Sequence, residues 1–308
     1  MSVDVKKMIN EKKSNQFLLK FNEKAAPTIF LICAIISVLT TLGIIITLLV
    51  ETFTFFSRVS FLDFITGTEW WPFGENPSFG VLPLISGTLL ITGIAMVVSI
   101  PIGIASAIYL SEFASDKVRR IVKPIMEVLA GIPTIVYGFF ALTFVTPVLQ
   151  QLIPSLPIFN ALSAGIVVGI MIIPMISSLS EDAMSAVPNE MRAGALAMGA
   201  TRLEVAMKIV VPAALSGIIS SFVLGISRAI GETMIVSVAA GASPKLTLDV
   251  TESIQTMTGY IVQVSMGDAT YGSTTYYSMY AVGMTLFVFT LCMNLLSQFI
   301  SRRFKEDY

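Results

Sequence analysis

Six long apolar stretches constrain this chain more than any other feature of its sequence. A helix needs about 20 consecutive, mostly apolar residues to cross a lipid bilayer. Stretches of this length run over residues 28–50, 84–110, 128–152, 158–180, 209–240 and 277–301. The composition agrees, because 55% of the 308 residues are hydrophobic and only 13% are charged. We therefore expect an all-α membrane protein with six transmembrane helices.

The basic residues gather in alternate loops between these stretches. Of the 19 Lys and Arg residues, 16 lie in the N-terminal segment, after the second and fourth stretches, and near the C-terminus: Lys6, Lys7, Lys12, Lys13, Lys20, Lys24, Lys117, Arg119, Arg120, Lys123, Arg192, Arg202, Lys208, Arg302, Arg303 and Lys305. Only Arg58 and Lys245 lie in the other loops, and Arg228 lies inside a stretch. Loops rich in Lys and Arg stay on the cytoplasmic side of a membrane. The distribution predicts that the N- and C-termini are both cytoplasmic.

The expected organisation is a basic cytoplasmic segment over residues 1–26, a membrane domain over 27–303 and a cytoplasmic tail over 304–308. Within the membrane domain, a cytoplasmic loop covers about 181–208 and an external loop covers about 241–276. Lysines alternate with apolar residues in the N-terminal segment, which fits either a helix on the membrane surface or a flexible tail. A full-length apolar stretch follows, so we expect no cleavable signal peptide.

Residues that the chain lacks exclude several classes of function. There is no histidine, which excludes a Ser-His-Asp triad and histidine-ligated metals. There is no G-x-x-x-x-G-K-[ST] loop to bind the phosphates of a nucleotide. The net charge of −1 does not suit a nucleic-acid-binding protein. We expect a protein that is embedded in membrane lipid. We expect it to be no enzyme and to bind no cofactor or metal itself.

The loop between the fourth and fifth stretches is patterned as two short helices. Pro188 is well placed to begin a helix, and Gly199 can adopt the left-handed conformation that ends one. A second helix over about 201–210 would lead into the membrane, where Pro212 would mark a kink. From these residues alone, the loop either docks into a groove of a partner protein or packs on its own bundle.

The same loop carries a spaced motif: Ala193-Gly194-Ala195, then Gly199, then Ile209-Val210-Val211-Pro212. It resembles the EAA loop of bacterial ABC importer permeases, although Ala193 stands where the family usually has Glu and Gly194 where it usually has Ala. The resemblance implies the type I ABC importer permease fold, with a coupling helix that sits in a cleft of an ATPase subunit. The residues assigned to this coupling are Glu190, Arg192, Ala193, Gly194, Ala195, Gly199 and Pro212.

Two charged residues, Arg228 and Glu232, lie inside the fifth stretch. A charged side chain in hydrocarbon is costly and usually faces the interior of a bundle or a water-filled path. On one continuous helix the two residues are one turn apart, so their side chains share a face and can pair. They either line a path for an anion, which the planar guanidinium suits, or form a salt bridge that fixes helix packing.

The segment around this pair, Arg228-Ala229-Ile230-Gly231-Glu232-Thr233, resembles the RAIGET motif of phosphate-specific (Pst) ABC importer permeases. In that family the Arg and Glu of the motif are implicated in phosphate passage, and we assign Arg228 and Glu232 to the substrate path on that ground. Segments 67–72, 79–83, 87–89, 131–139, 254–260 and 267–269 resemble the PstC-type subunit in particular.

This resemblance implies a bacterial plasma-membrane protein that imports inorganic phosphate by alternating access. The implied partners are a second permease subunit (PstA type), two ATPase subunits (PstB type) that bind ATP and Mg²⁺, and an extracytoplasmic phosphate-binding protein (PstS type). Alternatives are a secondary ion-coupled anion transporter, an ABC permease for another oxyanion, and a membrane scaffold in phosphate signalling.

Two weaker patterns concern packing. Gly165-x-x-x-Gly169 allows close contact between helices and is expected to serve packing within the chain. Trp70 and Trp71 suit an aromatic belt at the membrane surface.

Overall fold

The computed structural model describes the backbone of residues 5–303, and the side chains from Ala25 onward except at positions 297 and 300–303. The predicted tail 304–308 and the first four residues therefore lie outside the described residues. The chain divides into two compact units, Met1–Glu51 and Thr52–Tyr308. In the first unit a single helix, α1 (Val5–Phe56), runs without interruption through Pro27 and continues into the second unit.

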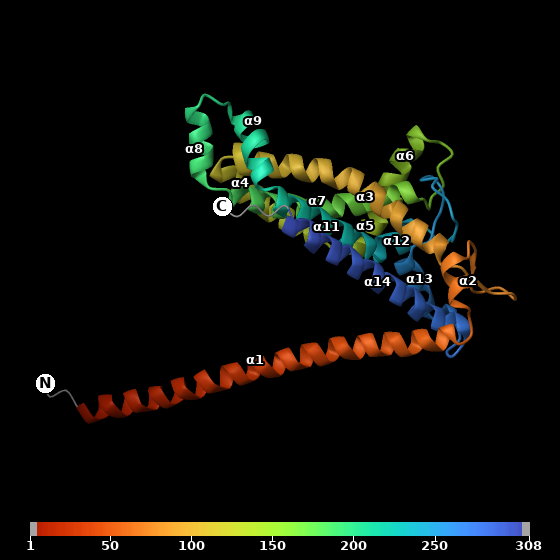
Figure 1. The fold of residues 1–308 in the computed structure, drawn as a ribbon, viewed down its shortest axis with the longest axis horizontal. Helices are drawn as coiled ribbons and strands as arrows, with labels where there is room; N and C mark the ends of the chain where they lie inside the picture. Colours follow the sequence, from red (N-terminus) through yellow and green to blue (C-terminus); the bar gives the residue numbers. More distant parts are fainter. Residues whose placement is uncertain (1–4, 304–308) are drawn as a thin grey trace. The chain divides into compact units, whose positions relative to one another are not determined.

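The second unit contains a small β-hairpin and a helical bundle (Figure 1). Its first half comprises α2 (Phe61–Thr66), β1 (Trp70–Trp71), β2 (Ser78–Phe79), α3 (Leu82–Ile108), the π-helical turn η1 (Tyr109–Phe113), α4 (Asp116–Ala130), α5 (Thr134–Phe140), η2 (Ala141–Val145), α6 (Thr146–Leu152) and α7 (Ala161–Ser185). The two strands are antiparallel, with Trp70 opposite Phe79.

The second half of this unit begins with the expected pair of short helices. It comprises α8 (Asn189–Ala197), α9 (Arg202–Val205), η3 (Ala206–Val210), α10 (Val211–Ala213), α11 (Leu215–Ile230), α12 (Met234–Ala239), α13 (Met257–Gln263), η4 (Val264–Asp268) and α14 (Thr274–Arg303). The segment 241–256, between α12 and α13, contains no helix or strand.

Within the part of the chain that the structure describes, five helical segments are long and apolar enough to cross a membrane, and a bent pair makes a sixth if it is one span. The five are Ala25–Phe56, Leu82–Phe113, Thr134–Leu152, Ala161–Ser185 and Thr274–Leu296; the bent pair is Arg202–Ala213 with Leu215–Ile230, at 71°. The expected all-α fold with six membrane-crossing segments is confirmed.

Two predicted spans differ from the structure in their details. The third was expected from residue 128 but begins at Thr134, because Pro133 fixes the start of α5 and α4 ends at Ala130. The fifth was expected as one helix over 209–240. It is instead bent near Ala214 and ends at Ile230, and α12 follows as a separate short helix.

The central contact of the bundle is between α3 and α7, and α11 packs against both (Figure 1). Ile91 and Ala95 of α3 and Val168 and Ile172 of α7 are buried in one cluster there. Gly165 and Gly169 permit this approach: a Cβ atom at Gly165 would lie 2.6 Å from the Cβ of Ile94, and one at Gly169 would lie 2.8 Å from the carbonyl oxygen of Ala95. The predicted packing role of this glycine pair is confirmed.

Trp70 does not belong to an exposed aromatic belt. Its side chain is buried in a second cluster, with edge-to-face contacts to Phe79 at 5.9 Å and Tyr260 at 4.8 Å between ring centroids. Pairing of β1 with β2 turns Trp70 inward and leaves its neighbour Trp71 exposed, because successive side chains of a strand point to opposite faces.

Within the second unit, α4, α8 and α9 lie at one end of the bundle, and α2, α6 and α13 lie at the other (Figure 1). The basic loops after α3 and α7 therefore share one end, as the predicted topology requires. The assignment of this end to the cytoplasm stays a prediction.

Replacing Gly169 by alanine tests the contact between α3 and α7. An added methyl group normally stabilises a helix interior by about 0.5–1 kcal/mol. At Gly169 it would press on the backbone of α3, and overpacking of this kind costs about 1–3 kcal/mol. We expect Gly169→Ala to lower the thermal unfolding midpoint of the purified protein in detergent.

The matched control is Gly93→Ala on α3, where an added Cβ would meet no heavy atom within 4 Å. It should leave the midpoint unchanged or raise it. Equal midpoints for the two variants would contradict close packing of α7 on α3.

Candidate functional site

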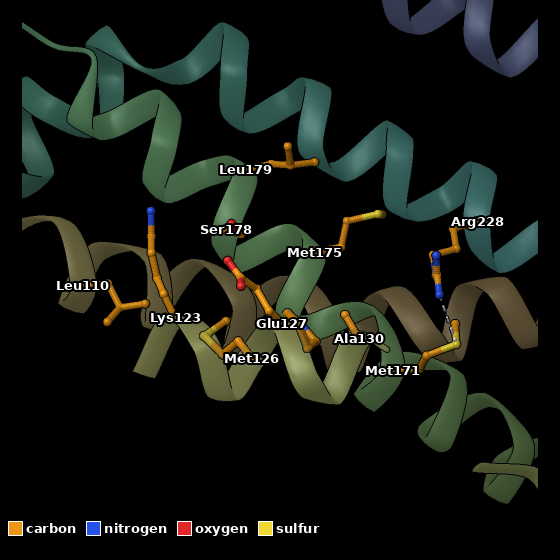
Figure 2. A pocket seen from close by; sticks show the side chains of 11 residues that line it. Leu110, Lys123, Met126, Glu127, Ala130, Met171, Met175, Ser178, Leu179 and Arg228 are labelled. Atoms are coloured by element: carbon orange, nitrogen blue, oxygen red, sulfur yellow. Dashed lines mark hydrogen bonds between the residues drawn. The ribbon is translucent and has the colours of Figure 1, made fainter. Parts of the chain in front are cut away.

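A cavity of about 420 Å³ lies between α4, α7 and the end of α11 (Figure 2). Its wall is mostly apolar but includes three charged side chains. The lining residues are Leu110, Lys123, Met126, Glu127, Ala130, Met171, Pro174, Met175, Ser178, Leu179 and Arg228. Lys123, Glu127 and Ala130 follow one another along α4, and Arg228 reaches the cavity from α11 (Figure 2).

Arg228 lies in the last turn of α11, and its guanidinium points towards Met171. The contact, from Nη2 to the sulfur of Met171, is 3.8 Å long, which is weak because a thioether is a poor acceptor. Among the described residues, no carboxylate forms an ion pair with Arg228. Its hydrogen-bond donors are therefore available to an anion in the cavity.

The other basic residue of the cavity is already neutralised by carboxylates. The ammonium group of Lys123 forms ion pairs with Asp182, at 3.1 Å, and with Glu181. Glu181 is fully buried, and it also pairs with Arg119 and accepts a hydrogen bond from Ser185 at 3.0 Å. This network joins α4 to α7. The two other charged residues that line the cavity, Arg228 and Glu127, form no ion pair with the described residues.

Glu232 is not part of this cavity. It follows the end of α11, and its side chain is buried. Its carboxylate accepts hydrogen bonds from the backbone N–H groups of Met234 (3.1 Å) and Ile235 (3.3 Å) at the start of α12. The hydroxyl of Thr258 donates to its carbonyl oxygen at 2.6 Å. Glu232 therefore stabilises a break in the membrane segment and connects it to α13.

The expected pairing of Arg228 with Glu232 is wrong. It assumed one continuous helix, but α11 ends at Ile230 with Gly231 as its C-cap. The first N–H groups of a helix have no intrahelical acceptor, and the carboxylate of Glu232 supplies one to α12. The two side chains consequently lie on opposite sides of the break. Arg228 faces the cavity, whereas Glu232 accepts hydrogen bonds from the start of α12.

The loop over 187–213 adopts the predicted form. Helix α8 ends before Gly199, whose φ of +88° is the left-handed conformation expected for it. Thr201 and Glu204 form a capping box at the start of α9. The bend of 71° falls at Ala214, two residues beyond Pro212.

A groove of about 480 Å³ runs between α8 and the η3–α10 segment. Four of the residues assigned to coupling line it, namely Glu190, Gly194, Ala195 and Pro212. Ala193 and Gly199 are exposed on the same loop. A Cβ atom at Gly194 or Gly199 would meet no other part of the chain, so this surface is open to a partner.

Arg192 is the exception among the residues assigned to coupling. Its side chain turns inward and is only 17% exposed, because it pairs with Glu112 in η1, which continues α3. The sequence did not indicate this pair, since the two residues are 80 positions apart. Nor did the sequence indicate that Glu127 lines the cavity or that Glu181 is buried.

Comparison with known proteins places this arrangement in a family. Residues 99–306 match the family described as "Binding-protein-dependent transport system inner membrane component". The chain belongs to this family. It is therefore a multi-pass protein of the bacterial plasma membrane and a transport subunit.

Several relatives match over most of the chain. The probable ABC transporter permease protein YqgH of Bacillus subtilis is 35% identical over 89% of each chain. The phosphate transport system permease protein PstC of Xylella fastidiosa is 33% identical over 79% of each chain. PstC 1 of Mycobacterium tuberculosis is 30% identical over 80% of this chain and 83% of its own.

Solved structures agree on the fold. A bacterial ABC transporter that imports the polysaccharide alginate has a TM-score of 0.66, with 18% identity over 94% of this chain and 100% of its own. The MetNI methionine transporter has a TM-score of 0.54 over 74% of this chain and 95% of its own. The chain has the type I ABC importer permease fold. A family member of this kind works with a second permease, ATPase subunits and a periplasmic binding protein.

Substitutions at Glu232 separate its structural role from its charge. Glutamine keeps an oxygen that can accept the hydrogen bonds from α12, whereas alanine removes it. Loss of such a cap costs about 0.5–2 kcal/mol. We expect Glu232→Gln to keep most of the transport activity of the complex and Glu232→Ala to lose most of it, measured as substrate uptake at matched protein levels. If the two variants lose uptake equally, the negative charge itself is required.

Proposed function

We propose that this chain is the PstC-type permease subunit of an ATP-driven importer of inorganic phosphate. The observation that carries the proposal is the match to relatives named phosphate transport permeases, at 30–33% identity over about four fifths of the chain. The arginine that faces the cavity supports it, because the substrate of such an importer is an anion. The chain would form the path together with a second permease subunit, and ATP hydrolysis would belong to a further subunit.

Arg228 is the proposed contact for phosphate in this path. Its planar guanidinium offers paired N–H donors that match two oxygens of an oxyanion. A liquid water molecule occupies about 30 Å³, so a cavity of about 420 Å³ has room for the anion together with several waters. The apolar wall lowers the local dielectric, which strengthens attraction between the guanidinium and the anion. Glu232 contributes to the path by fixing the end of α11 and hence the position of Arg228.

A second permease subunit of PstA type is proposed to complete the path. An extracytoplasmic phosphate-binding protein of PstS type would deliver the anion to the end of the bundle that carries α2 and α13. Two ATPase subunits of PstB type, holding ATP and Mg²⁺, would act at the cytoplasmic end. Transport would then proceed by alternating access, as ATP binding and hydrolysis change which end of the path is open.

The ATPase subunit is proposed to dock on α8. The groove between α8 and the η3–α10 segment supports this, because it is open and is lined by small or apolar residues together with Glu190 and Lys208. Small residues at Gly194 and Ala195 allow a partner backbone to approach closely. No G-x-x-x-x-G-K-[ST] loop occurs in the chain, so the nucleotide must be bound elsewhere.

Arg228→Gln tests the proposed path. Removing the guanidinium removes the main attraction for the anion while keeping a side chain of similar shape. We expect phosphate uptake by cells or by proteoliposomes that contain the complex to fall at least about 100-fold, the scale of a lost charge-assisted contact of about 3 kcal/mol. Assembly with the partner subunits should not change.

The matched control is Arg120→Gln, which removes the same charge from an exposed position on α4 and should leave uptake unchanged. Competition by sulfate and molybdate against labelled phosphate tests the substrate in the same assay. Normal uptake by the Arg228 variant would remove Arg228 from the path, and equal competition by all three anions would reject phosphate specificity.

A further inference from the structure

The side chain of Arg192 fastens the first helix of the coupling loop to the transmembrane bundle. Its Nη2 atom lies 3.0 Å from Oε1 of Glu112, and its Nε atom lies 3.3 Å and 3.4 Å from the two carboxylate oxygens. Nη2 also donates to the carbonyl oxygen of Met184 at 2.7 Å, and Nη1 donates to the carbonyl oxygen of Val187. All three nitrogens of the guanidinium are thus engaged within the chain.

This contact is well shielded from solvent, with the side chain of Arg192 17% exposed and that of Glu112 9% exposed. An ion pair in such surroundings is costly to break, because the remaining charge is left without a partner. By contrast, none of the nine residues of α8 is itself fully buried. Met191 and Ala195 add only partly buried apolar contacts. The Arg192 contact is therefore the most directional link between α8 and the bundle.

The partners of Arg192 belong to the two helices that form the centre of the bundle. Glu112 lies in η1, which directly continues α3, and Met184 lies in the last turn of α7. Helices α3 and α7 pack along each other, and α11, which carries Arg228, packs on both. A continuous set of contacts thus leads from α8 through α3 and α7 to the residue proposed to meet the anion.

We propose that Arg192 is a positioning residue that transmits movement of α8 to α3 and α7, and that it does not contact the ATPase subunit. The proposal rests on the docking of that subunit on α8 given under the proposed function. Helix α8 then has two roles. The open groove beside it binds the ATPase subunit, and the inward side chain of Arg192 connects α8 to the helices that line the path. Glu112 is the second member of this link.

The test compares Arg192→Gln, Glu112→Gln and the double variant in the complete complex, reconstituted into proteoliposomes with the phosphate-binding protein. Two quantities are measured, the amount of ATPase subunit recovered with the complex and the number of phosphate ions taken up per ATP hydrolysed. We expect full recovery of the ATPase subunit in all three variants. The uptake per ATP should fall about tenfold in each single variant, within the usual range of coupling between sites.

The double variant should be no worse than either single variant, because both changes remove the same link. Arg120→Gln again serves as the control and should leave both quantities unchanged. An additive loss in the double variant, or an unchanged uptake per ATP, would overturn the proposal. So would loss of the ATPase subunit from Arg192→Gln alone, which would indicate a direct contact.

If the glutamine variants do not assemble, Glu112→Asp provides the same test with a smaller change. It keeps the charge but withdraws the carboxylate from the guanidinium by one methylene group, and it should lower uptake per ATP by a smaller factor. The proposed function is tested separately by the wild-type complex. If the wild-type complex contains no ATPase subunit or takes up no phosphate, the proposed function is wrong. If it does both, the results for the variants test only the proposed link between Arg192 and Glu112.

Discussion

The close contact between α3 and α7 is the interaction on which the other functional elements depend. Gly165 and Gly169 let the two helices approach until side chains of one meet the backbone of the other. Small residues serve this purpose in membranes, where helix association relies on van der Waals packing rather than on the hydrophobic effect. The buried Glu181 attaches α4 to this pair, and the ion pair of Arg192 attaches α8 to it.

A second constraint acts at the end of α11. Backbone N–H groups exposed by a broken helix must find acceptors inside the protein, because the bilayer offers none. The carboxylate of Glu232 accepts from the N–H groups of Met234 and Ile235 at the start of α12, and the hydroxyl of Thr258 donates to the carbonyl oxygen of Glu232. A charged residue in the membrane segment thus satisfies backbone groups. The break places Arg228 in a final helical turn beside the cavity. Its guanidinium therefore forms no ion pair with Glu232, and we propose that it is the contact for the anion.

The sequence predicted the fold well where one local property decides the structure. Apolar length decided the spans, and the left-handed preference of glycine decided the turn at Gly199. It was wrong where an outcome depended on distant partners. After the end of α11 at Ile230, Glu232 accepts hydrogen bonds from donors in α12 and α13. Arg192 turns inward because Glu112, 80 residues earlier, lies within reach. Spacing along a helix contains no information on either contact.

The central claim is that this chain is one subunit of an ATP-driven importer. The most direct measurement is affinity purification of the full chain from its native membrane, followed by mass spectrometry of the proteins that accompany it. We predict recovery of a second six-helix permease and of an ATPase that carries a G-x-x-x-x-G-K-[ST] loop. Recovery of the chain alone, or only with further copies of itself, would contradict the account.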